Sequence, residues 1–145
     1  MTLTATWKQK MLFTAEADSH SVVMDAKAPF GSESALTPKQ LVLAAACGCT
    51  GMDIVGLLKK HKQPMEEFTI EAAAKTHEGH PAVFEEMELI FRLTGPIDSK
   101  TLIEAVQLSQ SKYCSVSAML AKAMPIHYKI FLNSELIGSG SAKFE

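Results

Sequence analysis

The chain has 145 residues and a mass of 15.8 kDa, which is the size of one ordinary domain with one hydrophobic core. Hydrophobic residues make up 47% and charged residues 21%, and these globular proportions exclude a disordered or fibrous chain. The 14 basic residues against 16 acidic ones give a formal net charge of -2, so we expect neither a nucleic acid nor an anionic membrane surface as a partner.

The first third of the chain is predicted to be β-structure. Apolar and polar residues alternate over Leu3–Trp7 and again over Phe13–Ala17, the period of a half-buried strand. A third extended run covers Ser21–Ala26 and ends before the breaker Pro29–Gly31. We therefore expect three short strands before residue 30.

A long helix is predicted next. Thr37 stands at the N-cap position, Pro38 at the first helical position and Gln40 at the third, which is the layout of a capping box. The helix is expected to run from Pro38 to about Lys60 and to be stopped by Pro64.

The segment Leu41–Leu58 of this helix is nearly uncharged, and a helix of ~20 residues at ~1.5 Å each would also match a membrane's thickness. Asp53 in its middle and three glycines argue against a membrane span, so we interpret it as a central core helix. Gly48, Gly51 and Gly56 each cost the helix ~1 kcal/mol relative to alanine. Such glycines indicate that another element packs close to the backbone.

Strands and two short helices are predicted to fill the rest of the chain. Phe68–Lys75 and Val83–Leu93 read as strands joined by a turn at residues 77–81. Asp98 or Ser99 caps a helix that reaches about Gln110, and a third helix covers Ser115–Ala123. A strand over Ile126–Leu132 follows, and an edge strand is expected before Phe144.

The expected element order is βββ-α-ββ-αα-β. This order is typical of an α+β domain with helices packed on one sheet face. Without a linker or an internal repeat, residues 1–145 are predicted to form a single domain.

The three cysteines are too few, and odd in number, for a disulfide framework. Because the first ten residues also lack the apolar core of a signal peptide, we expect a cytoplasmic protein with reduced thiols. Cys114 precedes a short helix, where unpaired N–H groups stabilise a thiolate. Cys49 lies in the middle of the apolar helix, where burial raises a thiol pKa unless a cation or donor stands near. A purely structural role as small buried hydrophobes remains open for both.

Metal binding is not expected. Cys47 and Cys49 are two positions apart, roughly 200° around a helix, so they cannot hold one metal ion together, and Cys47 is interpreted as packing. His77 and His80 fall on a predicted hairpin tip with no second pair of ligands nearby in the sequence. No metal and no cofactor is therefore predicted.

Two segments of the chain resemble the cysteine motifs of the OsmC/Ohr family. Residues 37–41 (TPKQL) followed by residues 44–50 (AAACGCT), Asp53 and Leu57 are similar to the first motif, a Pro-led helix with a cysteine after small residues. Residues 113–117 (YCSVS) are similar to the second motif. The resemblance implies an OsmC-like α+β fold in an intertwined homodimer, with the long helix central and active sites at the dimer interface. It further implies that Cys49 reacts with the peroxide and that Cys114 resolves the product.

The chain departs from the family's peroxidases in its charged residues. Those proteins place an arginine beside the reactive cysteine and a glutamate soon after the helix-opening proline, whereas the only arginine here is Arg92 and Lys39 follows Pro38. The chain is closer to a divergent branch described as predicted redox proteins or regulators of disulfide bond formation. Candidate replacement cations are Lys8, Lys10, Lys27 and, through a bend or from a second subunit, Lys39.

Two functions follow as expectations. The first is a thiol-dependent reductase of organic hydroperoxides, cycling Cys49 and Cys114 through a sulfenic acid and a disulfide with an unidentified thiol reductant. The apolar helix favours organic peroxides by partition into the pocket. The alternative is a dimeric binding module for an apolar small molecule, such as an oxidised lipid or acyl group, with structural cysteines.

Overall fold

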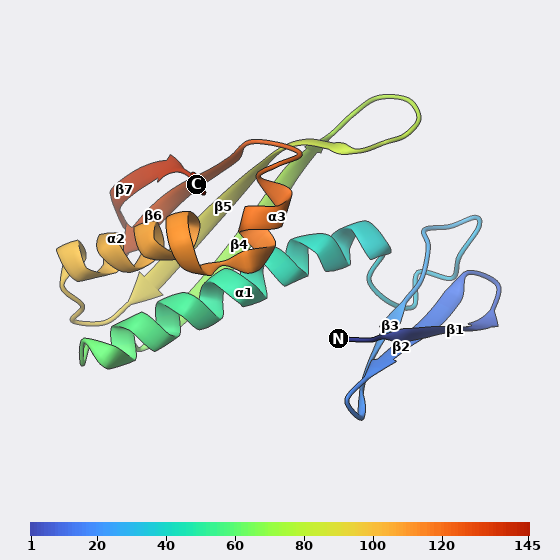
Figure 1. Ribbon diagram of the computed structural model, residues 1–145, viewed down its shortest axis with the longest axis horizontal. Helices are drawn as coiled ribbons and strands as arrows, with labels where there is room; N and C mark the ends of the chain where they lie inside the picture. The colour runs from blue at the N-terminus through green and yellow to red at the C-terminus, as the bar shows by residue number, and fades with distance from the viewer. The chain divides into compact units, whose positions relative to one another are not determined.

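The protein, described here by a computed structural model over all 145 residues, is a mixed α+β chain (Figure 1). It gathers into two compact units, Met1–Val42 and Leu43–Glu145, and the single-domain expectation stays a prediction. The elements are β1 (Thr4–Gln9), β2 (Leu12–Ala17), β3 (His20–Met24), α1 (Pro38–Lys60), β4 (Glu67–Thr76), β5 (Phe84–Thr94), α2 (Ser99–Leu108), the π-helix η1 (Ser109–Tyr113), α3 (Ser115–Leu120), β6 (Ile126–Leu132) and β7 (Glu135–Ser141).

The first unit is built on an antiparallel sheet in the order β1-β2-β3. Asp18 and Ser19 form the two-residue connection between β2 and β3 with φ of 49° and 65°, the left-handed conformation that tight hairpins use. The three N-terminal strands predicted from alternation are confirmed.

Asp25 organises the segment between β3 and α1. Its carboxylate is 2% exposed and accepts hydrogen bonds of 2.8–3.1 Å from the backbone N–H groups of Ala26, Ser32 and Ser34 and from the Ser34 hydroxyl. These bonds, led by the Ser34 N–H, lower the pKa of Asp25 to about 2. The loop therefore folds around one ionised side chain.

The start of α1 is fixed by the predicted capping box. The Thr37 N–H donates to Gln40 Oε1 at 2.8 Å, and the Gln40 N–H donates back to Thr37 Oγ1 at 3.3 Å. The buried side chains of the helix recur every four residues and so form one stripe along it: Ala46, Thr50, Ile54 and Leu58.

The second unit places helices on one face of a four-stranded sheet in the order β4-β5-β6-β7. The β5–β6 pair is parallel, and the chain crosses between these strands through α2, η1 and α3. Buried residues alternate along β5 and β6 and pack against α1 and α2, which lie on the same side of the sheet (Figure 1). The core includes Ile54, Leu58, Met87, Leu89, Phe91, Leu102, Val106, Ile126 and Ile130.

The strands β1–β3 form a sheet of their own, a division that the sequence-based expectation did not specify. Two helix ends differ from that expectation. The helix expected to reach Gln110 ends at Leu108 and continues as η1, which closes with a bond from the Cys114 N–H to the Ser109 carbonyl, five residues back. The helix expected to reach Ala123 ends at Leu120. The edge strand expected near the C-terminus is β7.

Candidate thiol site

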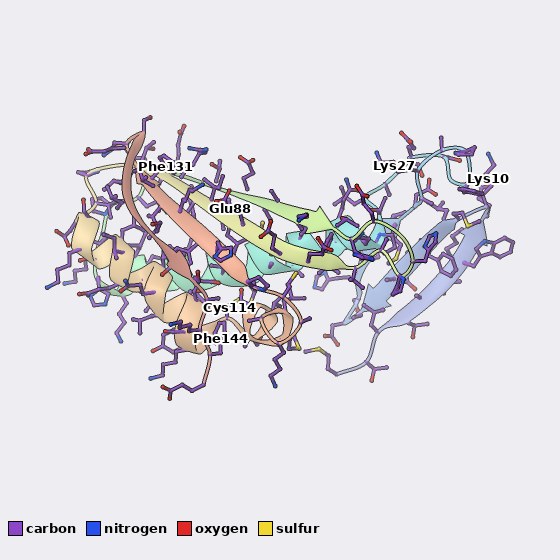
Figure 2. All side chains as sticks on the ribbon, turned by 90° about the horizontal axis from the view of Figure 1, so that it is seen from above. Lys10, Lys27, Glu88, Cys114, Phe131 and Phe144 are labelled. Carbon is purple, nitrogen blue, oxygen red and sulfur yellow. The ribbon has the colours of Figure 1, made fainter.

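The fold brings together two cysteines that lie 65 positions apart in the chain. Cys49 lies in the middle of α1. Cys114, which Figure 2 labels, is the N-cap residue of α3, and 0% of its surface is exposed. Their Sγ atoms lie within 4.8 Å of each other, and both thiols are free. The pair is close enough for a disulfide to form through side-chain rotation and small backbone shifts.

The Cys114 sulfur is held by hydrogen-bond donors from two elements. The Thr50 hydroxyl of α1 donates to it at 3.4 Å, and the Ser117 N–H of α3 donates to it at 3.3 Å. Both donors reach a sulfur that is closed off from solvent, so the Cys114 side chain is held in place between α1 and α3.

Gln110 of the π-helix fixes the Thr50 hydroxyl in turn. Its Nε2 donates to Thr50 Oγ1 at 3.0 Å and lies 3.4 Å from Ser117 Oγ. Its Oε1 is buried and has no hydrogen-bond partner. Because Thr50 accepts from the amide, its own proton is directed at Cys114, and the wide turn of η1 is what places Gln110 there.

Cys49 is half-buried and is the more accessible of the two thiols. Burial raises its pKa, and the neighbouring Cys114 adds to that effect, while the Val116 N–H and the Ser115 hydroxyl, 4.0 Å away, lower it. The groups that act most strongly on this thiol include no cation. The expected effect of a mid-helix position on the pKa of Cys49 is confirmed.

Asp53 completes the cluster. It follows Cys49 by one helical turn on α1, and a carboxylate oxygen of Asp53 lies within 4.8 Å of both sulfur atoms. The buried Ser109 hydroxyl donates to its Oδ2 at 2.9 Å. Cys49, Asp53 and Cys114 are the residues of this site with atoms that could hold a metal ion.

The other candidate residues lie away from this cluster. Cys47 packs against the core, with its sulfur 3.9 Å from the Ile70 carbonyl oxygen, so its interpretation as packing is confirmed. Arg92 stacks at 4.5 Å on the ring of Phe131, on the sheet face away from the helices, where Figure 2 labels Phe131. His77 lies in the loop after β4, with its Nδ1 2.9 Å from Glu85 Oε1. Arg92, the only arginine of the chain, is therefore not the cation beside Cys49.

Sequence reasoning did not assign roles to Asp53, Ser109 and Gln110. The only available signal was the four-residue spacing of Cys49 and Asp53 on one helix face. Ser109 and Gln110 are placed by a π-helix, which hydrophobic periodicity does not reveal.

Comparisons with known proteins agree on one family. A family model described as "OsmC-like protein" matches residues 31–129. The protein YhfA of Escherichia coli K12 is 34% identical over 122 residues, which cover 83% of this chain and 89% of that relative.

Two solved structures share the fold. A hypothetical protein of Aquifex aeolicus VF5 superposes with a TM-score of 0.78 at 28% identity, covering 91% of this chain and 96% of that one. The organic hydroperoxide resistance protein OhrB of Bacillus subtilis superposes with a TM-score of 0.64 at 18% identity, covering 91% and 96% of the two chains. The expected α+β architecture is confirmed.

Proposed function

The chain belongs to the OsmC-like protein family, and from this premise we propose that it reduces organic hydroperoxides with Cys49 and Cys114. The observation that carries the proposal is the proximity of a half-buried and a fully buried thiol from two separate elements. A solved structure with the same fold carries organic hydroperoxide resistance in its name, which supports this substrate class for the proposal.

The proposed order of reaction is supported by the accessibility of the two thiols. The Cys49 thiolate attacks the terminal oxygen of the hydroperoxide, the O–O bond breaks, and the alcohol leaves after taking up a proton. The Cys49 sulfenic acid is then attacked by Cys114, which releases water and forms the disulfide. A dithiol reductant from outside the chain returns both sulfurs to thiols by exchange.

Assembly as a homodimer is part of the proposal. Family members are typically dimeric. The first unit leaves large apolar side chains exposed, among them Trp7 at 60% and Phe30 at 74%. Along α1 a shallow, mostly apolar groove is open to solvent, and its lining is Gly48, Gly51, Met52, Val55, Gly56, Lys59, Phe68 and Ile70. A second copy would cover these surfaces, since isolated soluble chains rarely leave so much apolar area open.

The proposed dimer could also supply the positive charge that Cys49 lacks within one chain. A thiol whose pKa is raised needs a positive neighbour to react fast at neutral pH. We propose that a lysine of a second copy supplies this charge, with Lys8, Lys10, Lys27 and Lys39 as the candidates.

The three free cysteines fit a reducing compartment, and we propose that the protein lies in the cytoplasm.

Helix α1 is long and apolar enough to cross a membrane by length and composition alone. Because the family consists of soluble bacterial proteins, we interpret α1 as the core helix of a soluble fold.

The test is to treat the reduced protein with an organic hydroperoxide and to map its thiols by mass spectrometry. We expect the loss of two hydrogen atoms and a Cys49–Cys114 disulfide. Cys49→Ser should abolish the reaction, whereas Cys114→Ser should stop at a sulfenic acid that a dimedone probe captures.

The matched control is Cys47→Ser, which removes the third thiol and should react like the natural protein. A protein whose thiols survive the peroxide, or whose disulfide includes Cys47, would refute the proposal. Unchanged thiols together with binding of an acyl compound would favour the alternative of a binding module.

A further inference from the structure

The cluster of two thiols and one carboxylate supports a second chemistry that needs no peroxide. We propose that the reduced protein binds one zinc-type divalent cation through Cys49 Sγ, Cys114 Sγ and a carboxylate oxygen of Asp53. The ligand atoms come from α1 and from the start of α3, and all of them lie within 4.8 Å of one another. The inference does not rest on the proposed peroxide chemistry.

The distances suit a zinc-sized ion. Two thiolates each ~2.3 Å from a tetrahedral zinc lie ~3.8 Å apart, so the cluster needs to contract by only ~1 Å, which is within reach of side-chain rotation. Three protein ligands leave a fourth position for water, which can enter past the half-buried Cys49. Paired thiolates with a carboxylate favour zinc over the harder magnesium and calcium ions.

The ligands are held in place by buried groups. Ser109 donates to Asp53 Oδ2 at 2.9 Å, which fixes the orientation of the carboxylate. Thr50 and the Ser117 N–H hold the Cys114 sulfur, and all three residues that support the ligands, Thr50, Ser109 and Ser117, are 0% exposed. Supporting hydrogen bonds of this kind orient metal ligands and increase affinity.

Charge within the cluster favours a cation. Once both thiols lose their protons, the three donors carry three negative charges, and a divalent ion neutralises two of them. Binding converts two thiols and one free ion into a bis-thiolate complex and releases two protons to solvent, with no change in oxidation state.

Metal binding and disulfide formation exclude each other, because the disulfide uses both sulfur ligands. Oxidation of the pair is therefore expected to release the ion. The bound cation therefore prevents the two thiols from reacting, and oxidation of the thiols to the disulfide releases the cation.

The experiment is an anaerobic titration of the reduced full-length protein with Co²⁺, followed by competition with Zn²⁺. We expect one ion per chain and thiolate-to-cobalt charge-transfer absorption, which directly reports sulfur ligation. Asp53→Asn should weaken Zn²⁺ binding by at least ~10-fold, and Asp53→Cys, which restores a ligand of similar length, should recover it. Cys49→Ser and Cys114→Ser should each lose the charge-transfer band.

Cys47→Ser is the matched control and should bind like the natural protein, since Cys47 contacts the Ile70 carbonyl and not the cluster. Absence of charge-transfer absorption, equal affinity of Asp53→Asn and the natural protein, or equal loss in Cys47→Ser would overturn the inference. Zinc binding in a protein whose thiols survive peroxide would refute only the proposed function. If peroxide forms the disulfide but the reduced protein does not bind Co²⁺, only the metal-binding inference is refuted.

Discussion

Cys49 and Cys114 have the same side chain but differ in solvent exposure and in hydrogen-bond partners. Cys114 is sealed from solvent and receives two hydrogen bonds, from Thr50 and the Ser117 N–H. Cys49 stays accessible, and burial together with its neighbour raises its pKa. The two roles proposed for the pair follow from this difference, because the accessible sulfur meets the peroxide first.

The ionised carboxylate of Asp25 makes the loop around it sensitive to acid. Its pKa is about 2 in the folded chain against an ordinary value of 3.8, so its contribution to stability is complete above pH 4 and is lost as the pH falls through 2. Amide hydrogen exchange should therefore show falling protection of the Ser32 and Ser34 N–H groups over this range. Asp25→Asn should lower their protection at pH 5 and remove its acid dependence.

Asp18→Asn is the control for this measurement, because Asp18 is an exposed turn residue of the same unit and asparagine tolerates its positive φ. Equal protection at pH 2 and pH 5 in the natural protein would contradict the assigned role of Asp25.

Helix α1 combines an ordered start with an unusual density of glycine. Gly48 and Gly56 have no atoms within 4 Å of the place where a Cβ would stand, whereas a Cβ on Gly51 would lie 3.0 Å from Ile70 Cδ1. Two of the three glycines therefore serve no packing need within one chain. The close approach expected from the sequence stays a prediction at these two positions, and the proposed second copy is the element that we expect to make it.

Gly56→Ala tests this interpretation. In an isolated chain the change would stabilise α1 by ~1 kcal/mol through helix propensity. Against a second copy the added methyl overpacks the interface by ~1–3 kcal/mol, so we expect the dimer to dissociate at a roughly 10-fold or more higher concentration, measured by analytical ultracentrifugation.

Gly51→Ala is the comparison, because its methyl would lie 3.0 Å from Ile70 Cδ1 of its own chain, so we expect a lower free energy of unfolding for this variant than for Gly56→Ala. A Gly56→Ala protein that is more stable and equally dimeric would show that α1 is not the interface.

At the scale of the whole molecule, the first unit lacks a core of its own. Ala15 and Asp25 are the only buried residues among residues 1–42, and neither provides a large apolar side chain. A sheet of three short strands with exposed apolar residues depends on another surface for stability. The proposed homodimer supplies that surface.

The single tryptophan of the chain makes this dependence measurable. Sedimentation should give a mass near twice 15.8 kDa. Dilution below the dimer's dissociation constant should shift Trp7 emission to longer wavelength, because Trp7 is 60% exposed in one chain and covered in the proposed dimer. A monomeric mass at micromolar concentration, or emission independent of dilution, would contradict the homodimer.

The sequence by itself determined the local elements, because their signals are local. Strand alternation in residues 3–17, the capping box at Thr37 and Gln40, and the helix start at Cys114 each depend on neighbouring residues and were predicted correctly. The family was also recognisable, since its two cysteine motifs are short and linear.

Only the tertiary structure decided which of these pieces meet. The strands β1–β3 pair as two hairpins, and no local pattern shows that they stay apart from the sheet of β4–β7. The placement of Asp53, Gln110 and Thr50 around the thiols depends on α1 packing beside η1 and α3. Such contacts join residues more than 50 positions apart, and the free energy of packing that selects them leaves no local pattern in the sequence.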